Sequence, residues 1–134
     1  MKAHWIALAC CLGLPALAAA EHPLLPGYAA QARQADPAFA GFSAERGRAL
    51  YFSEAQREGT AMSCASCHTA DPRQAGKTPA RRRVEPLAPV ANPKRLSDAQ
   101  KVEKWFRRNC DDVFARECTA REKGDFITWL DSLK

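Results

Sequence analysis

The stretch Cys64-Ala65-Ser66-Cys67-His68 decides what this chain folds around. Two thiols three residues apart can each add to one vinyl group of a haem and form thioethers that fix the porphyrin edge to the chain. The adjacent imidazole can then reach the iron from one face. The motif therefore predicts one covalently bound haem c, attached through Cys64 and Cys67, with His68 as the proximal iron ligand.

Two other uses of a Cys-x-x-Cys pair are disfavoured by the rest of the sequence. A redox-active disulfide of the thioredoxin kind requires a βαβ setting at a helix N-terminus, and no strand pattern is present. A zinc site would need two further ligands, for which only His22 and the distant Cys110 and Cys118 remain. Haem attachment is the favoured interpretation.

Residues 1–20 are typical of a secretory signal peptide. Met1 and Lys2 are followed by an apolar run over residues 5–17, and Ala18-Ala19-Ala20 then forms a small-residue cleavage site. The run is shorter than the about 20 residues that span a bilayer, and no amphipathic pattern supports the alternative of a retained anchor. We expect cleavage after Ala20, export to a bacterial periplasm and no membrane span afterwards. Export agrees with covalent haem attachment, which takes place outside the cytoplasm.

Cleavage of this leader would leave 114 of the 134 residues, which is one domain. So short a chain buries only about 60–68% of its unfolded surface, so a buried cofactor or a covalent staple is expected. The formal charge of +5 falls to +4 when Lys2 is removed, which is moderate for an exported protein and argues against a nucleic-acid partner.

The region before the haem motif divides at residue 43. Residues 21–42 are rich in Pro, Ala and Gly, so we expect a loosely structured N-terminal lead-in with at most one helical turn over residues 29–35. Ser43 is a suitable N-cap for a first firm helix over residues 44–55. A mid-helix glycine costs about 1 kcal/mol relative to Ala, so Gly47 indicates the close approach of another helix.

The region after the motif begins with a long loop over residues 60–92. A capping box of Ser97 and Gln100 opens a helix that runs to about residue 108. A second capping box, of Thr119 and Glu122, opens a last helix that runs to about residue 133. No strand-length alternation is present, so the predicted fold is all-α, with helices joined by long loops in a domain over residues 43–134.

The sixth iron ligand is not an obvious one. Cytochromes c usually use Met or a second His there, but Met62 is two residues before Cys64 and cannot reach the opposite face. His22 lies in the lead-in and is expected to be solvated. Asn109 lies at i+7 from Val102, on the apolar stripe that also holds Trp105 and Phe106. Asn is also favoured at helix C-termini, so the residues alone leave two roles open for Asn109, an iron ligand and a helix C-cap.

Cys110 and Cys118 form the remaining pair of thiols. A disulfide is favoured because exported proteins normally pair their thiols, and closing so short a loop would stabilise the fold by up to about 3 kcal/mol. The alternative, an iron-bound thiolate from Cys110, would leave Cys118 unpaired outside the cell.

Two further stretches carry a family resemblance. Residues 84–95, read as Val-Glu-Pro-Leu-Ala-Pro-Val-Ala-Asn-Pro-Lys-Arg, and residues 102–110, read as Val-Glu-Lys-Trp-Phe-Arg-Arg-Asn-Cys, resemble the sphaeroides haem protein (SHP) family of oxygen-binding class I cytochromes c. The resemblance extends from the haem motif to the final helix. It implies a class I cytochrome c fold, in which Gly47 and Tyr51 would cross Phe126 and Trp129. It also implies Asn109 as the sixth ligand of ferric iron and a Cys110–Cys118 disulfide.

The same resemblance implies a function. It suggests electron transfer with a redox partner, in the family a dihaem cytochrome c, and a sixth haem site that opens on reduction and binds O₂, NO or CO. An amide oxygen is a hard ligand that suits ferric better than ferrous iron. One alternative is a plain six-coordinate electron carrier that uses His22.

Another alternative is a haem enzyme that reduces peroxide, hydroxylamine or NO. No distal His is present as a general acid, so an electron-transfer and gas-binding protein is favoured over an enzyme. The basic run Arg81-Arg82-Arg83 carries no family marker and is interpreted as a solvated loop rather than a docking site.

Overall fold

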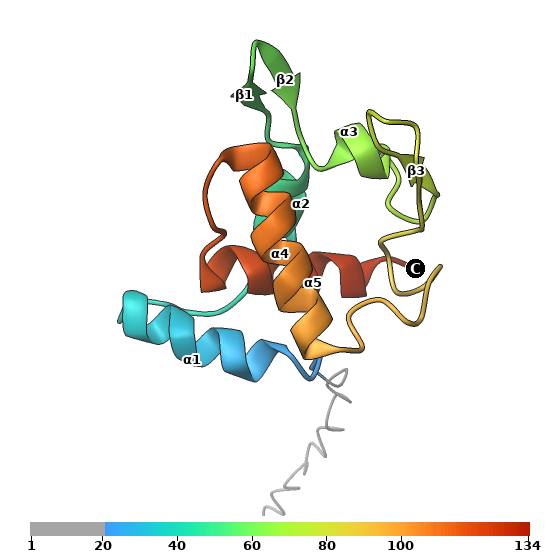
Figure 1. The fold of residues 1–134 in the computed structure, drawn as a ribbon. Helices are drawn as coiled ribbons and strands as arrows, with labels where there is room; N and C mark the ends of the chain where they lie inside the picture. The colour runs from blue at the N-terminus through green and yellow to red at the C-terminus, as the bar shows by residue number, and fades with distance from the viewer. Residues whose placement is uncertain (1–20) are drawn as a thin grey trace, which may run out of the picture.

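The computed structural model describes residues 21–134, so the predicted signal peptide over residues 1–20 lies outside the described residues. Five helices and two short hairpins follow one another along this part of the chain (Figure 1). The helices are α1 (Leu25–Ala35), α2 (Ala44–Phe52), α3 (Ala65–His68), α4 (Ala99–Phe114) and α5 (Ala120–Ser132). The strands are β1 (Ala55–Arg57), β2 (Thr60–Met62), β3 (Gly76–Lys77) and β4 (Arg83–Val84). No helix within residues 21–134 has the length and apolar character needed to cross a membrane.

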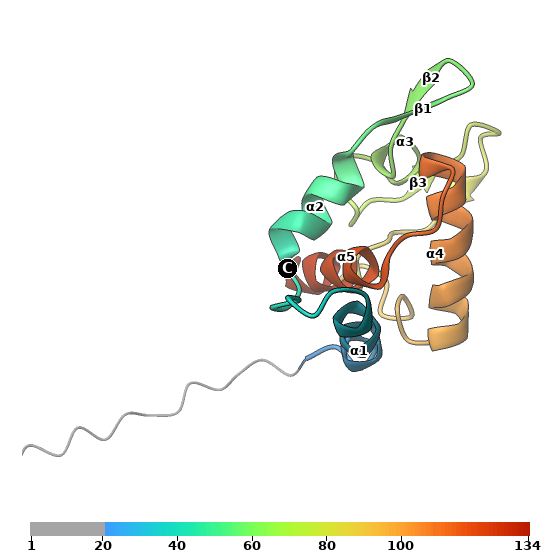
Figure 2. The same ribbon diagram turned by 90° about the vertical axis from the view of Figure 1, so that its left-hand side faces the viewer.

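The crossing of α2 and α5 is the most extensive helix pairing of the described chain (Figures 1 and 2). Gly47 lies at the crossing, where a Cβ atom would come within 2.1 Å of the Asp125 carbonyl oxygen. The predicted close approach is therefore confirmed. Tyr51 lies one turn later and packs on Phe126 and Trp129, with its ring centroid 4.8 Å from that of Trp129.

Both predicted helix starts at this crossing are confirmed. The Ser43 hydroxyl accepts a hydrogen bond from the Arg46 amide, and the Thr119 hydroxyl accepts one from the Glu122 amide. The Glu122 carboxylate in turn accepts from the Thr119 amide, which completes the capping box. α2 ends at Phe52 rather than residue 55 because the chain turns into the first hairpin.

The lead-in before residue 43 differs from the prediction. An 11-residue helix, α1, lies below α5 and buries one stripe against it, formed by Leu25, Tyr28, Ala29 and Ala32. These positions follow the i, i+3, i+4, i+7 spacing of an amphipathic helix. Pro26, interpreted from the sequence as a breaker, lies in the first helical turn, where its missing N–H would have no intrahelical partner.

Helix α4 begins and ends at other residues than predicted. Asp98, not Ser97, is its N-cap and accepts a hydrogen bond from the Lys101 amide. The helix continues past residue 108 to Phe114, because Cys110 and Val113 extend the buried stripe by more than one turn. It ends at Ala115, which adopts the left-handed conformation common at helix C-termini.

Two antiparallel hairpins contradict the expectation that no strands form. β1 pairs with β2 through a two-residue turn in which Glu58 and Gly59 both have positive φ, as a type I′ turn requires. β3 pairs with β4 over two residues each. Strands of two or three residues are too short to show an alternating pattern, so the sequence could not reveal them. The fold is otherwise all-α, as predicted.

Candidate haem site

The attachment motif forms the short helix α3, which in both ribbon views lies beside the C-terminal half of α4 (Figures 1 and 2). Cys64 and Cys67 are both free thiols, and both are half-buried. Within residues 21–134 no three His, Cys, Asp or Glu side chains come close enough together to hold a metal ion.

The imidazole of His68 lies in an environment that favours its neutral form. Burial, followed by the positive charge of Arg95, lowers the pKa of His68 to about 4. Neutral imidazole is the form that ligates iron. Burial likewise raises the pKa of the Cys64 thiol to about 11, so this sulfur lies in apolar surroundings. Two thiols beside apolar side chains, together with a neutral imidazole, fit a covalently attached haem.

An apolar wall adjoins the motif. Its buried members are Tyr51, Phe126, Trp129 and Leu130, and the partly buried residues packed against them include Cys64, Ala65, Leu87, Leu96 and Phe106. Tyr51 also makes a polar contact: its hydroxyl donates to the Thr69 carbonyl oxygen at 2.6 Å. Thr69 follows His68 directly and has a φ of 67°. The crossing of α2 and α5 thus fixes the residue after His68, the predicted proximal ligand.

The loop over residues 69–98 folds back onto the motif. The amides of Leu87 and Ala88 both donate to the Pro72 carbonyl oxygen, which ties the two limbs of the loop together. Gly76 of β3 packs directly over α3, since a Cβ atom there would come within 1.8 Å of the Cys67 carbonyl oxygen. Nothing in the sequence around Gly76 signals this contact.

One face of α4 is directed toward the haem-attachment motif. Burial and, after it, the negative charge of Asp112 raise the pKa of the Cys67 thiol. Asp112 therefore lies on the side of α4 that is near α3. Asn109 precedes Asp112 by three residues and therefore shares that face. It is half-buried, and among the side-chain hydrogen bonds of residues 21–134 none involves it. Asn109 is five residues before the last residue of α4, so the C-cap interpretation is wrong.

The other sequence candidates are placed as follows. Trp105, predicted to be buried beside Val102 and Phe106, is 44% exposed, while Val102 is buried. Met62 ends β2, just before the motif. The Nδ1 atom of His22 accepts a hydrogen bond from the Leu24 amide at 3.3 Å, at the start of α1.

Cys110 and Cys118 are joined by a disulfide, with their Cα atoms 5.7 Å apart. The bond links the last part of α4 to the residue that precedes the N-cap of α5. A thiolate iron ligand from Cys110 is incompatible with this pairing.

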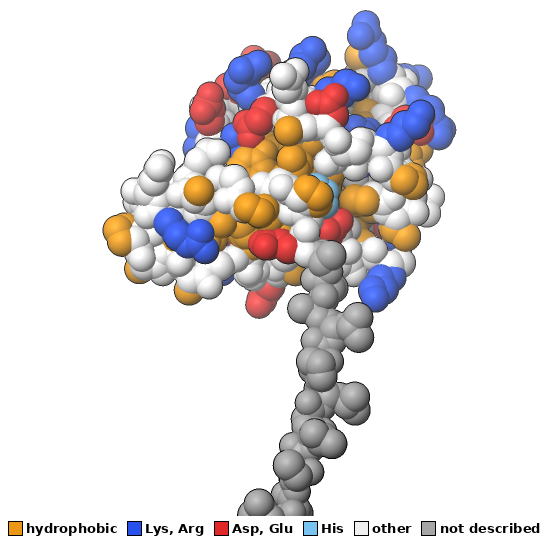
Figure 3. Space-filling model, turned by 90° about the horizontal axis from the view of Figure 1, so that it is seen from below, with side chains coloured by type: hydrophobic (Ala, Val, Ile, Leu, Met, Phe, Trp, Pro, Cys, Tyr) orange, Lys and Arg blue, Asp and Glu red, His pale blue; other side chains and the backbone are white. Residues whose placement is uncertain are grey.

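Charge is distributed unevenly along the chain. Residues 73–108 hold eleven Lys and Arg side chains against three Asp and Glu, a formal charge of +8, whereas the other described residues hold eight against twelve. In the view from below, most visible Lys and Arg side chains lie along two adjoining edges of the molecule (Figure 3). We call residues 73–108 the basic segment; it contains Arg81–Arg83, of which Arg83 pairs with Glu85 at 2.7 Å.

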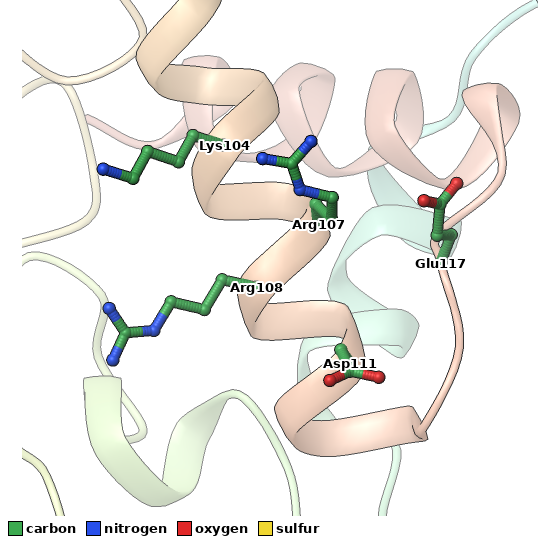
Figure 4. Close-up of a pocket in the computed structure, with 5 residues that line it drawn as sticks. All are labelled: Lys104, Arg107, Arg108, Asp111 and Glu117. Atoms are coloured by element: carbon green, nitrogen blue, oxygen red, sulfur yellow. The ribbon is translucent and has the colours of Figure 1, made fainter.

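A shallow hollow lies on the outer surface of α4 (Figure 4). Its lining residues are all charged: Lys104, Arg107, Arg108, Asp111 and Glu117. Lys104 and Arg108 extend from one side of the helix, and Glu117 lies on the other (Figure 4). The guanidinium of Arg108 also lies over the Trp105 ring, 5.7 Å from its centroid. None of the predicted haem residues lines this hollow.

Comparison with known proteins places the chain in a family. Residues 37–130 match a family model described as a domain of unknown function, DUF1924. The cytochrome c-type protein SHP of Cereibacter sphaeroides is 43% identical over 130 residues, covering 95% of this chain and 96% of the relative. Cytochrome c″ of Methylophilus methylotrophus is 41% identical over 73 residues, covering 54% of this chain and 51% of that protein.

Solved structures agree with this placement. A structure of oxidised SHP, described as an oxygen-binding cytochrome c, superposes with a TM-score of 0.73 at 43% identity and covers 82% of this chain and 94% of that one. A crystal structure of oxidised cytochrome c″ superposes with a TM-score of 0.76 at 33% identity, covering 83% and 92%. The chain therefore belongs to the DUF1924 family and is a c-type cytochrome related to SHP, with haem c as its cofactor.

Proposed function

We propose that this chain is an exported, periplasmic monohaem cytochrome that transfers electrons and binds a diatomic gas at a haem site opened by reduction. Cys64 and Cys67 hold the haem through thioethers, and His68 ligates the iron from one face. Asn109 ligates ferric iron from the other face and releases it on reduction.

The position of Asn109 in the middle of α4 carries this proposal. It shares a face with Asp112, which acts on the Cys67 thiol, and its amide has no hydrogen-bond partner within residues 21–134. The two conventional ligands are poorly placed, since Met62 leads directly into the motif and His22 accepts a hydrogen bond at the start of α1. An amide with no other use, facing the attachment segment, supports a ligand role.

The chemistry of the amide supports redox gating. Its oxygen is a hard, neutral donor, so its bond to iron weakens when the metal gains an electron. The freed side chain stays on the same helical face and can donate a hydrogen bond from its NH₂ group to a small ligand. That the related SHP is described as an oxygen-binding cytochrome c supports the choice of ligand class.

Optical and EPR spectra of wild type and Asn109→Val test this proposal. We expect a six-coordinate ferric wild type, a changed ferric spectrum in Asn109→Val, and CO binding by both ferrous proteins. His22→Gln is the matched control and should leave all spectra unchanged. An unchanged ferric spectrum in Asn109→Val contradicts the ligand assignment. A ferrous wild type that ignores CO contradicts gas binding, and a changed ferric spectrum in His22→Gln favours the plain carrier.

The basic segment supports a redox partner with an acidic surface, such as another cytochrome. It adjoins α3 and supplies most of α4, so the positive charge lies on the side of the molecule that holds the haem motif. Charge of this sign steers anionic partners and makes their encounter rate depend on salt.

Two small redox reagents measure this field. Ferricyanide, an anionic oxidant, should oxidise the ferrous protein faster at low salt than at high salt, and the cationic oxidant tris(phenanthroline)cobalt(III) should show the opposite salt dependence. Lys104→Glu should lower the rate of oxidation by ferricyanide more than Arg33→Glu, which makes the same change in net charge on α1. Equal effects of the two substitutions would show that the basic segment has no special role.

A further inference from the structure

Arg95 is a half-buried cation within the loop that folds over the motif. Its neighbour Leu96 and the nearby Leu87 pack against the same apolar wall as Cys64. Its guanidinium is held by the carbonyl groups of Glu85 and Pro86, the two residues that precede Leu87. Arg95 therefore lies in the wall of the haem site rather than on the outer surface of the basic segment.

The polar partners of Arg95 are all neutral. Nε donates to the Pro86 carbonyl oxygen at 2.9 Å, and one terminal nitrogen, Nη2, donates to the Glu85 carbonyl oxygen at 3.0 Å. The other terminal nitrogen, Nη1, has no acceptor within residues 21–134. No Asp or Glu carboxylate of the described chain comes within 4.0 Å of this guanidinium. The Glu85 carboxylate pairs with Arg83 and acts on Arg95 only through its charge.

Two other buried charges of the described residues are paired. Asp125 and Lys123, the most buried charged side chains that form ion pairs, have Arg46 and Glu103 as partners. A cation withdrawn from water with only carbonyl acceptors pays a desolvation cost that an opposite charge would offset. Haem c brings two propionate carboxylates into the protein, and a guanidinium recognises a carboxylate through paired N–H donors.

We propose that Arg95 binds a haem propionate through its Nη1 edge, while its other edge holds the Glu85 and Pro86 carbonyl groups. Arg95 then has two consequences: it orders the loop against the haem, and it places a fixed positive charge beside the cofactor. A positive charge there disfavours the ferric form, which carries one more positive charge than the ferrous form, and so raises the reduction potential. This inference depends on haem attachment but not on the release of Asn109.

The test compares purified holoproteins carrying Arg95→Gln, Arg95→Lys and Arg83→Gln. Arg83 is the matched control, because it belongs to the same loop and pairs with Glu85 at the surface. We expect Arg95→Gln to lower the equilibrium constant for reduction about tenfold, which is a decrease of 59 mV for one electron. Arg95→Lys keeps the charge and should lose much less, and Arg83→Gln should leave the potential unchanged.

Resonance Raman spectra supply a second readout, because the propionate bending mode reports hydrogen bonding to that carboxylate. The mode should shift in both Arg95 variants and not in Arg83→Gln. A purely structural role for Arg95 predicts lower stability with an unchanged potential and an unchanged bending mode, and this result would overturn the proposal. If Arg95→Gln does not fold, the bending mode of Arg95→Lys alone decides the outcome. Ferrous CO binding, which tests the Asn109 gate, is expected to persist in every Arg95 variant.

Discussion

The crossing of α2 and α5 and the haem side of the molecule, which comprises α3, residues 69–98 and α4, are stabilised by different means. At the crossing, Gly47 allows two backbones to touch, and Tyr51 and Leu130 are completely buried. On the haem side the chain is largely irregular, and the two most exposed large apolar side chains of the described residues, Val90 and Trp105, both lie there.

This difference shows which part of the fold is self-sufficient. The crossing is closed by side-chain packing and by the Arg46–Asp125 ion pair, and a packed interior tolerates little change in volume. The haem side is held by covalent links, one disulfide and two expected thioethers, together with hydrogen bonds to loop carbonyls. We expect substitutions at the crossing to affect folding and those on the haem side to affect local order first.

The strongest test of the comparison is Gly47→Val. Its Cβ would overlap the Asp125 carbonyl oxygen, and neither backbone can move without opening the crossing. We expect a loss of more than about 3 kcal/mol of unfolding free energy, or failure to fold. Thermal and urea unfolding of the holoprotein measure the effect. The control is Gly27→Ala on α1, where nothing lies within 4 Å and stability should stay equal or rise slightly. A well-folded Gly47→Val would show that the crossing is looser than described.

Removal of the disulfide tests the haem side. The double substitution Cys110→Ser with Cys118→Ser opens a loop with a sequence separation of 8. The chain-entropy relation gives a loss of about 2–3 kcal/mol. Hydrogen exchange should show the loss of protection concentrated at the end of α4, with α2 and the crossing unchanged. Uniform loss of protection across the chain would mean that the two regions are not distinct.

Tyr51→Phe sharpens the comparison, because this side chain belongs to the crossing while its hydroxyl reaches Thr69. The substitution keeps the packing and leaves the Thr69 carbonyl oxygen without its donor, which costs about 1–2 kcal/mol. The proximal ligand segment should loosen, and the ferric spectrum should broaden or shift while the far-UV CD spectrum stays the same. An identical ferric spectrum in Tyr51→Phe would show that the crossing has no influence on the haem side.

The smallest expected effect is electrostatic and lies at the junction between the two regions. A hydrogen bond from the Arg116 side chain lowers the pKa of Glu122 below its usual value, and a hydrogen bond from the Thr119 amide lowers it to a smaller extent. A carboxylate with a depressed pKa stabilises the fold above the unfolded-state pKa of about 4.3, and this contribution is lost as pH falls through the folded-state value. Since Arg116 is half-exposed, the contribution should be below about 1 kcal/mol.

The variant Glu122→Gln isolates that contribution, because Gln can still complete the capping box. Urea unfolding between about pH 7 and about pH 3 should show a smaller loss of stability on acidification than in wild type. Parallel curves for the two proteins would assign the acid sensitivity to other carboxylates.

Features set by neighbours in the sequence could be predicted. The caps at Ser43 and Thr119 depend on contacts three residues away, and Gly47 is conspicuous because glycine weakens a helix unless something requires it. α1 could not be predicted in the same way, because a proline in a first helical turn resembles a breaker until the partner helix is known. The end of α4 is hidden in the sequence because a cysteine occupies a buried position of the helical stripe, where its apolar character counts and its thiol chemistry does not.

The site follows the same division. The sequence shows Cys64, Cys67 and His68 as one contiguous motif. It also shows Asn109 on the same helical stripe as apolar residues of α4. The contacts of Gly76 and Arg95 arise from the path of the loop over residues 69–98, which brings distant backbone carbonyls to them. No local pattern encodes that path, so these residues become visible only in the folded chain.

The continuation of α4 beyond Asn109 constrains how this residue can move. With more than a turn of helix after it and the disulfide at Cys110, its backbone cannot swing away as a ligand on a loop can. A ligand in this position detaches only by rotation about its two side-chain torsions, which takes picoseconds to nanoseconds for an unhindered side chain. If Asn109 ligates the iron as proposed, its release would therefore be a rotamer change of one side chain, with the backbone of α4 held in place by the helix and the disulfide.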